Sequence, residues 1–185
     1  MPSCGRTLLC FCAVAFAAGC AGPDGASLSP FPFWGLRVGT RLDGLQQFFI
    51  RQDNIPWSCD TLLGGLRRCS RYVNFPQGTF EALADAQGRV VRMRLDITDH
   101  DGGDLIFDEQ LGVMEKRWFK VKGMRVDTGG VSDAHPIGTV VFSTAHGRWT
   151  AAVTFDGHKC FGAARACPVR VELTDHRAPG VDGVL

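Results

Sequence analysis

The sequence contains no apolar run long enough to cross a membrane as a helix. Its longest such run covers residues 7–18, whereas a membrane-spanning helix needs ~20 apolar residues. A short apolar run behind one positive charge, here Arg6, is typical of a secretory signal peptide. We therefore expect residues 1–19 to direct export and to be removed from the mature chain.

The chain also lacks the short motifs that mark common catalytic and cofactor sites. It has no G-x-S-x-G, S-x-x-K, P-loop or dinucleotide-binding pattern. Its five histidines do not occur at H-x-x-x-H or H-E-x-x-H spacing. The sequence therefore indicates neither a catalytic residue nor a cofactor. A hydrolase whose two carboxylates meet only in the folded chain stays open as an alternative, because sequence spacing does not reveal such a pair.

Neither sign of charge is in excess. The chain has 20 Lys and Arg residues against 19 Asp and Glu residues, and loss of Arg6 with the signal peptide leaves 19 of each sign. No cluster of basic residues interleaved with aromatic residues occurs. Such clusters supply the attraction to phosphate backbones, so we do not expect nucleic acid as a partner.

The apolar run ends in small residues followed by a cysteine, Ala17-Ala18-Gly19-Cys20. This segment resembles the lipobox of bacterial lipoproteins. The resemblance implies cleavage before Cys20, acylation of that cysteine (diacylglycerol and palmitate) and stable membrane anchoring by several acyl chains. Because Ala21 rather than Asp follows, it also implies the periplasmic leaflet of the outer membrane. The alternative is an ordinary signal cut at an A-x-A site such as Ala15-Phe16-Ala17.

Four cysteines remain in the mature chain once Cys20 carries lipid: Cys59, Cys69, Cys160 and Cys167. An even number in an exported protein predicts two disulfides. Neighbours in sequence favour Cys59–Cys69 and Cys160–Cys167, although the two other pairings stay open. The spacings do not resemble the C-x2-C pairs of zinc sites, so we expect no thiolate metal site.

Hydrophobic periodicity predicts a β-rich α+β domain behind a flexible tether of residues 20–32. One helix is expected from about residue 41 to 50, with Thr40 and Asp43 as a capping box. A second is expected from Asp104 to about residue 120. Their apolar faces comprise Leu42, Leu45 and Phe49 in the first helix, and Phe107, Leu111, Met114 and Trp118 in the second.

Strands are predicted where apolar and polar residues alternate. In residues 89–98, Val91, Met93, Leu95 and Ile97 alternate with charged residues, which indicates one core face and one solvent face. The other predicted strands are 71–75, 80–84, 139–144, 148–156 and 169–174. Residues 123–136 are expected to form a loop, and residues 177–185 a disordered tail.

Residues 94–100 and 170–176 match position for position with conservative changes. The match predicts a duplicated unit, with halves at 33–103 and 104–176. Residues 35–45 resemble the helix opening of the β-lactamase inhibitor protein superfamily, which also includes small outer-membrane assembly lipoproteins. The resemblance implies two helix-plus-antiparallel-sheet units in tandem, each with a disulfide.

One acidic segment, containing Asp99, Asp101 and Asp104, faintly resembles a calcium loop. Gly103 stands where such a loop needs its third Asp, so a turn followed by a helix N-cap is favoured and no metal is expected.

The sequence therefore predicts a non-enzymatic, membrane-anchored envelope lipoprotein that binds a protein partner or has a structural role. Aromatic residues exposed among Trp34, Trp57 and Phe161 would be the first binding anchors to examine. The alternative is a ligand- or metal-binding lipoprotein, or a hydrolase with a dispersed carboxylate site.

Overall fold

The computed structural model describes residues 27–51, 55–74, 77–97, 105–129, 137–156, 169–178 and 181. Within these ranges the chain forms one antiparallel sheet of eight strands and two α-helices. The predicted β-rich α+β class is confirmed. The helices are α1 (Leu42–Ile50) and α2 (Leu105–Trp118), and a short 3-10 turn covers Leu63–Gly65. The strands are β1 (Ser58–Thr61), β2 (Arg67–Asn74), β3 (Gln77–Ala84), β4 (Val90–Ile97), β5 (Arg125–Gly129), β6 (Ile137–Ser143), β7 (Trp149–Asp156) and β8 (Val169–Asp175).

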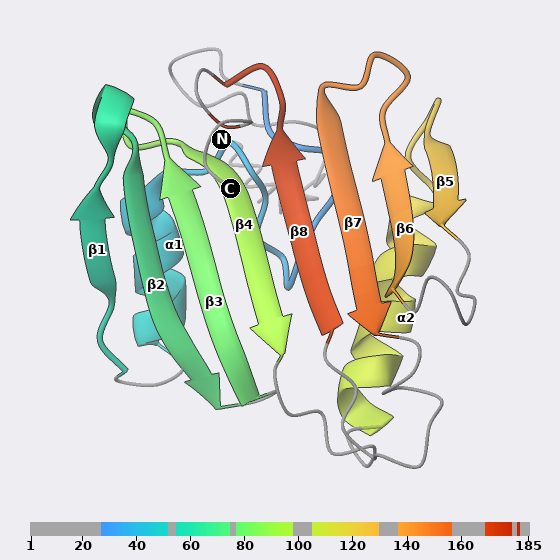
Figure 1. The fold of residues 1–185 in the computed structure, drawn as a ribbon, viewed down its shortest axis with the longest axis horizontal. Coiled ribbons are helices and arrows are strands. Elements are labelled where there is room, and N and C mark those ends of the chain that lie inside the picture. The colour runs from blue at the N-terminus through green and yellow to red at the C-terminus, as the bar shows by residue number, and fades with distance from the viewer. Residues whose placement is uncertain are drawn as a thin grey trace, which may run out of the picture.

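The strand order is β1-β2-β3-β4-β8-β7-β6-β5 (Figure 1). The last strand, β8, therefore lies in the middle of the sheet and pairs antiparallel with β4. In this central pair Leu95 lies directly opposite Val171. The two outer strands, β1 and β5, each follow a helix in the chain.

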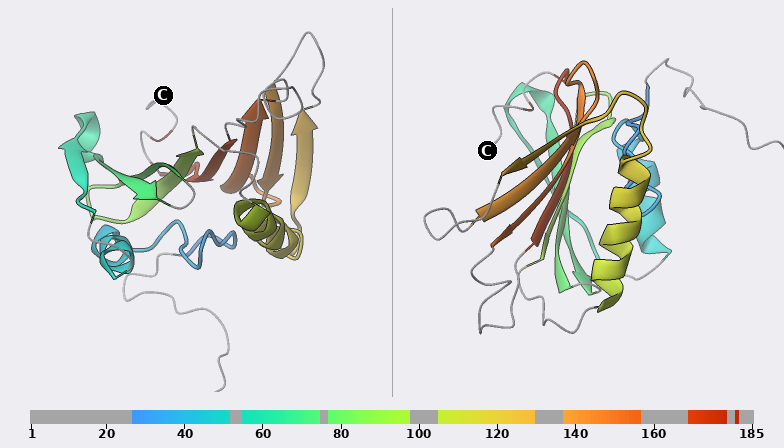
Figure 2. Two further views of the ribbon diagram at one scale, coloured as in Figure 1. Left: turned by 90° about the horizontal axis from the view of Figure 1, so that it is seen from below. Right: turned by 90° about the vertical axis from the view of Figure 1, so that its right-hand side faces the viewer.

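Both helices cover the same face of a strongly twisted sheet (Figure 2). In Figure 1, α1 lies behind β2 and β3, and α2 lies behind β6 and β7. The segment before α1 lies between the two helices and contributes Phe31, Phe33 and Val38 to the core. The other face carries neither of the two described helices, and we call it the helix-free face.

The main core fills the space between the helices and the sheet. The predicted apolar face of α1 is confirmed, because Leu42, Leu45 and Phe49 are all buried. Of the core face predicted for residues 89–98, Met93, Leu95 and Ile97 are buried in this core. The fully buried large side chains of this core include Phe31, Phe33, Phe49, Phe80, Met93, Leu95, Trp118 and Phe142. Burial of this apolar area is the main force that holds the helices to the sheet.

The predicted capping box of α1 is wrong. Arg41 is the N-cap residue and makes no side-chain cap hydrogen bond. The Thr40 hydroxyl instead donates to the carbonyl of Arg37 at 2.7 Å. Thr40 therefore stands one position before the N-cap, and its side chain belongs to the turn that precedes the helix.

Two strands were not predicted. Residues 125–129, expected to lie in a loop, form β5, and residues 58–61 form β1. Every residue of β5 is exposed, so the sequence shows no alternation between apolar and polar positions. Edge strands of this kind are held by backbone pairing with a single neighbour.

A β-bulge changes the face that Val91 occupies. The register between β3 and β4 shifts at Leu83 and Ala84, so Val91 does not join Met93 in the main core as predicted. Val91 packs with Leu66, Leu83 and Val181 in a second, smaller cluster. Of the expected disordered tail, Ala178 and Val181 therefore pack against the sheet.

Candidate functional site

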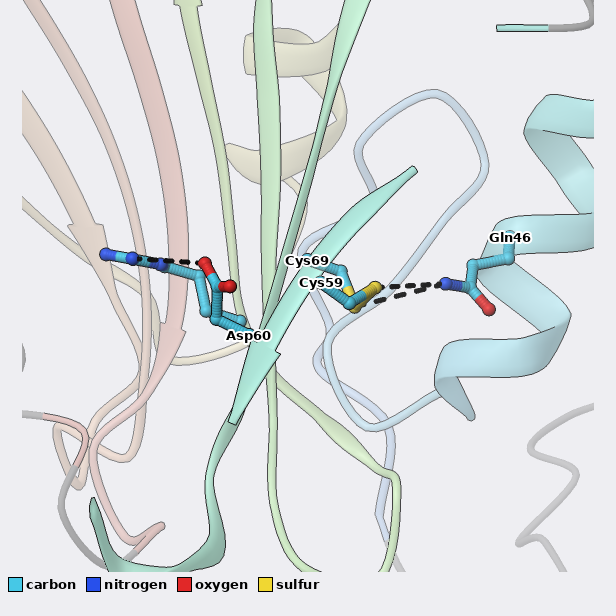
Figure 3. Close-up of a disulfide and its surroundings, with 5 residues drawn as sticks. Gln46, Cys59, Asp60 and Cys69 are labelled. Carbon is cyan, nitrogen blue, oxygen red and sulfur yellow. Dashed lines mark hydrogen bonds and ion pairs between the residues drawn. A yellow bond between two sulfur atoms is a disulfide. The ribbon is translucent and has the colours of Figure 1, made fainter. Parts of the chain in front are cut away.

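The disulfide Cys59–Cys69 is confirmed and joins β1 to β2. The two cysteines lie directly opposite each other in the strand pair, with Cα atoms 4.1 Å apart. Gln46 of α1 donates its side-chain amide to both sulfurs, at 3.6 and 3.9 Å (Figure 3). Asp60 points to the other face of the sheet. The disulfide therefore ties the edge strand and α1 to the same part of the core.

Charged side chains cross the centre of the helix-free face. Glu81 of β3 contacts Arg92 at 3.4 Å and Arg94 at 3.6 Å, both on β4. Arg94 also pairs with Asp96 at 2.8 Å, and Asp96 pairs with Arg170 of β8. We call these five residues the charge ladder. It links three adjacent strands through alternating positive and negative side chains.

The charge ladder is fixed by the strand register. Arg94 lies opposite Glu81 on one side and Glu172 on the other, so opposite charges meet across neighbouring strands. Thr174 donates to Glu172 at 3.3 Å. The ladder is partly shielded, since the side chain of Arg92 is 7% exposed whereas that of Arg170 is 53% exposed. Exposure therefore increases towards Arg170.

An exposed aromatic side chain lies beside the ladder. Tyr72 of β2 is the single tyrosine of the chain and is 47% exposed. It pairs with Thr79 of β3, which in turn lies opposite Asp96 of β4. Tyr72, Thr79, Asp96 and Arg170 thus form one row across the helix-free face. An aromatic ring and a partly exposed guanidinium therefore lie on one rigid surface.

Two of the aromatic residues that the sequence suggested as exposed binding anchors are not exposed. Trp34 and Trp57 are half-buried and pack against the main core, with Trp34 4.5 Å from Phe33 and Trp57 5.6 Å from Phe49 between ring centroids. The exposed aromatic residues in the described chain include Tyr72 and Phe119 instead. Tyr72 alternates with the buried Arg71 and Val73, which was the signal in the sequence for its outward position.

Several other predicted site residues lie outside the described residues. They are the acylation site Cys20, the pair Cys160 and Cys167, the acidic residues Asp99, Asp101 and Asp104, and Phe161. Among the residues that the structure describes, no group of three His, Cys, Asp or Glu side chains is placed to hold a metal ion. No helix in those same ranges has the length and apolar character needed to cross a bilayer.

Comparison with known proteins gives no assignment. No protein-family model, no curated protein and no solved structure matches the chain.

Proposed function

We propose that this protein is a bacterial envelope lipoprotein, anchored through Cys20, whose domain binds another protein through its helix-free face. The observation that carries the proposal is the row formed by Tyr72, Thr79, Asp96 and Arg170. Tyr and Arg are the side chains most enriched, together with Trp, among residues that dominate binding energy at protein interfaces. The lipobox and the lack of catalytic motifs support a binding role over an enzymatic one.

The charge ladder supports this role physically. Its ion pairs are already formed in the free domain, so a partner that covers them does not have to order these long side chains. Alternating charges also disfavour partners with the wrong charge pattern, because like charges that meet across an interface are repulsive. We expect a partner surface with a groove for Tyr72 and a carboxylate near Arg170.

We also propose that the domain arose by duplication of a helix-plus-sheet unit, with halves at 33–103 and 104–176 and a second disulfide, Cys160–Cys167. In the described part of the chain each half contributes one helix followed by four strands, and the strand order reverses at the centre of the sheet. The sequence repeat makes Leu95 equivalent to Val171, and these two residues face each other in the central pair. This arrangement supports kinship with the β-lactamase inhibitor protein superfamily.

The binding surface is tested by site-specific photo-crosslinking in the full-length, acylated protein. A benzoylphenylalanine at position 72 is expected to give a discrete adduct in cell envelopes, and Arg170→Glu should abolish that adduct. The matched control is the same crosslinker at position 119, which is also exposed but lies at the end of α2. An adduct of equal yield from both positions, or one insensitive to Arg170→Glu, would rule out the helix-free face as the binding surface.

The anchor is tested separately by fractionation. Cys20→Ser removes the thiol that accepts lipid and should release the folded protein from membranes. If the variant still fractionates with the membrane as completely as the parent, Cys20 is not the anchor.

A further inference from the structure

A pocket of about 230 Å³ lies at one end of the central strands. The turn between β3 and β4 contributes Asp85 and Arg89, and the start of β7 contributes Arg148 and Trp149. The end of β8 and the residues after it contribute Asp175 and Arg177. All these segments lie at the upper end of the sheet in Figure 1, where β3 and β8 end and β4 and β7 begin. The volume is smaller than the ~300–1,000 Å³ of pockets for drug-sized ligands, so a small group fits best.

The pocket also lies where the chain enters the domain. Ser27, the first described residue, lines it, and its hydroxyl accepts a hydrogen bond from Arg148 Nη1 at 2.6 Å. Seven residue steps separate Ser27 from Cys20, and each step spans at most ~3.6 Å, so the two residues lie within about 25 Å of each other. Under the proposed function Cys20 is held at the membrane surface. The pocket is therefore near the lipid headgroups.

The carboxylates of the pocket already have donors. Asp175 accepts two hydrogen bonds from the guanidinium of Arg148, at 3.2 and 3.0 Å, and one from the Arg177 backbone N–H at 3.1 Å. Asp85 accepts the Arg89 side chain at 2.9 Å and two backbone N–H groups of its own turn, from Gln87 at 3.0 Å and Arg89 at 2.8 Å. Both acidic groups are thus neutralised by arginines within the pocket.

The charged side chains that line the pocket have more hydrogen-bond donors, on arginines, than acceptors, on aspartates. Three arginines face two aspartates, which leaves one net positive charge. Within the described residues Arg177 is exposed and its guanidinium makes no ion pair, whereas Arg89 and Arg148 each pair with an aspartate. Arg148 is held over the ring of Trp149, 4.1 Å from the centroid, which restricts its orientation. Guanidinium groups with unused donors are suited to bidentate binding of phosphate oxygens.

We propose that this pocket binds the phosphate of an anionic phospholipid headgroup and so seats the anchored domain on its membrane. Arg177 and the outer nitrogens of Arg89 supply the donors, while Arg148 and Asp175 hold the walls in place. The proposal rests on the proposed lipid anchor, because the anchor brings the pocket to the headgroups. The strands then run away from the membrane, and the helix-free face is turned sideways, open to a partner.

The test is vesicle sedimentation with the full chain carrying Cys20→Ser, which has no acyl chain. Vesicles of phosphatidylcholine alone give the binding contributed by any apolar segment. Vesicles with about 30% phosphatidylglycerol, at the same ionic strength, should bind more protein. Arg177→Gln should reduce this additional binding about fivefold, the effect of one arginine near an anionic surface.

Arg51→Gln is the matched control, since it removes the same charge from an exposed position at the far end of α1. It should leave binding within about twofold of the parent. Glycerophosphoglycerol, the headgroup without acyl chains, should compete at fixed ionic strength. A thermal melt of each variant confirms that it is folded.

Three results would overturn the proposal. The first is equal binding to both vesicle types. The second is the same loss in Arg177→Gln and Arg51→Gln, which would indicate diffuse attraction. The third is binding of inorganic phosphate without binding to vesicles, which would make this a soluble-phosphate site. None of these results depends on acylation, so failure here is distinct from failure of the Cys20 fractionation test.

Discussion

The indole N–H of Trp118, on α2, donates a hydrogen bond of 2.8 Å to the carbonyl of Pro32, 86 residues earlier in the chain. Trp118 is fully buried, and its ring meets Phe31 at a centroid distance of 6.4 Å and Phe142 at 5.2 Å. One side chain therefore connects α2, the segment before α1 and the second half of the sheet.

Trp118→Phe should lower the free energy of unfolding by about 1–3 kcal/mol. The variant loses the hydrogen bond, leaves the Pro32 carbonyl without its donor and removes part of the ring volume from the core. Urea denaturation measures the change. Val113→Ala, on an exposed part of the same helix, is the control and should change stability by no more than about 0.5 kcal/mol. Equal effects of the two substitutions would contradict the role given to Trp118.

Removing the confirmed disulfide by Cys59→Ala with Cys69→Ala should lower stability by about 3 kcal/mol. The cysteines are 10 residues apart, and the chain-entropy estimate for a loop of that size gives this magnitude. The measurement is urea denaturation under non-reducing conditions. Ser58→Ala with Ser70→Ala changes the neighbouring pair in the same two strands and serves as the control. A loss below about 1 kcal/mol would show that the edge strand is held mainly by other contacts.

Two glycine substitutions should have opposite signs. Gly78→Ala in β3 places a methyl group against the backbone carbonyl of Asp96 in the adjacent strand, so it should destabilise the domain by about 1–3 kcal/mol. Gly44→Ala in α1 meets no neighbouring atom and should stabilise the domain by up to about 1 kcal/mol, because Ala favours helix. Thermal or urea denaturation of the two variants side by side checks both. If Gly44→Ala destabilised the domain, the added methyl group would have to meet neighbouring atoms in the folded protein, contrary to the structure.

Stability should depend on pH through Glu115. Burial raises the pKa of the Glu115 carboxyl above its ordinary value. The folded state therefore holds the proton more tightly than the unfolded state, and ionisation as pH rises above the ordinary pKa disfavours the fold. Glu115→Gln removes this effect. The variant should melt at a higher temperature than the parent at about pH 7, and the two should converge at about pH 3.5. An equal gain at both pH values would instead indicate a better-packed side chain.

Strands with one buried face could be predicted from the sequence, and those without one could not. In β7 and β8, buried residues such as Ala151, Val153 and Val171 alternate with outward-facing ones, and this period is visible without a structure. The short edge strands β1 and β5 have no such period, because most of their side chains are exposed on both faces. Their conformation depends on backbone pairing with β2 and β6, which is a tertiary property.

The row of residues on the helix-free face and the pocket could not be predicted from the sequence either. The repeat of residues 94–100 at 170–176 indicated that β4 and β8 are equivalent, but not that they pair with each other. The contact between Asp96 and Arg170 depends on that pairing. The pocket depends on it as well, since pairing of β4 with β8 brings Arg89 close to Asp175. The alternation of apolar and polar residues also does not predict the bulge that moves Val91 out of the main core.

The position of β8 in the middle of the sheet has a consequence for how the protein is made. A chain that is synthesised from its amino end produces β1 to β7 first, and until residues 169–175 follow, β4 and β7 each present an unpaired edge. Two half-sheets with open apolar edges are prone to wrong pairing and aggregation. The nascent chain therefore depends on rapid delivery of its last strand, and a chain interrupted before β8 is expected to be recognised by chaperones or degraded.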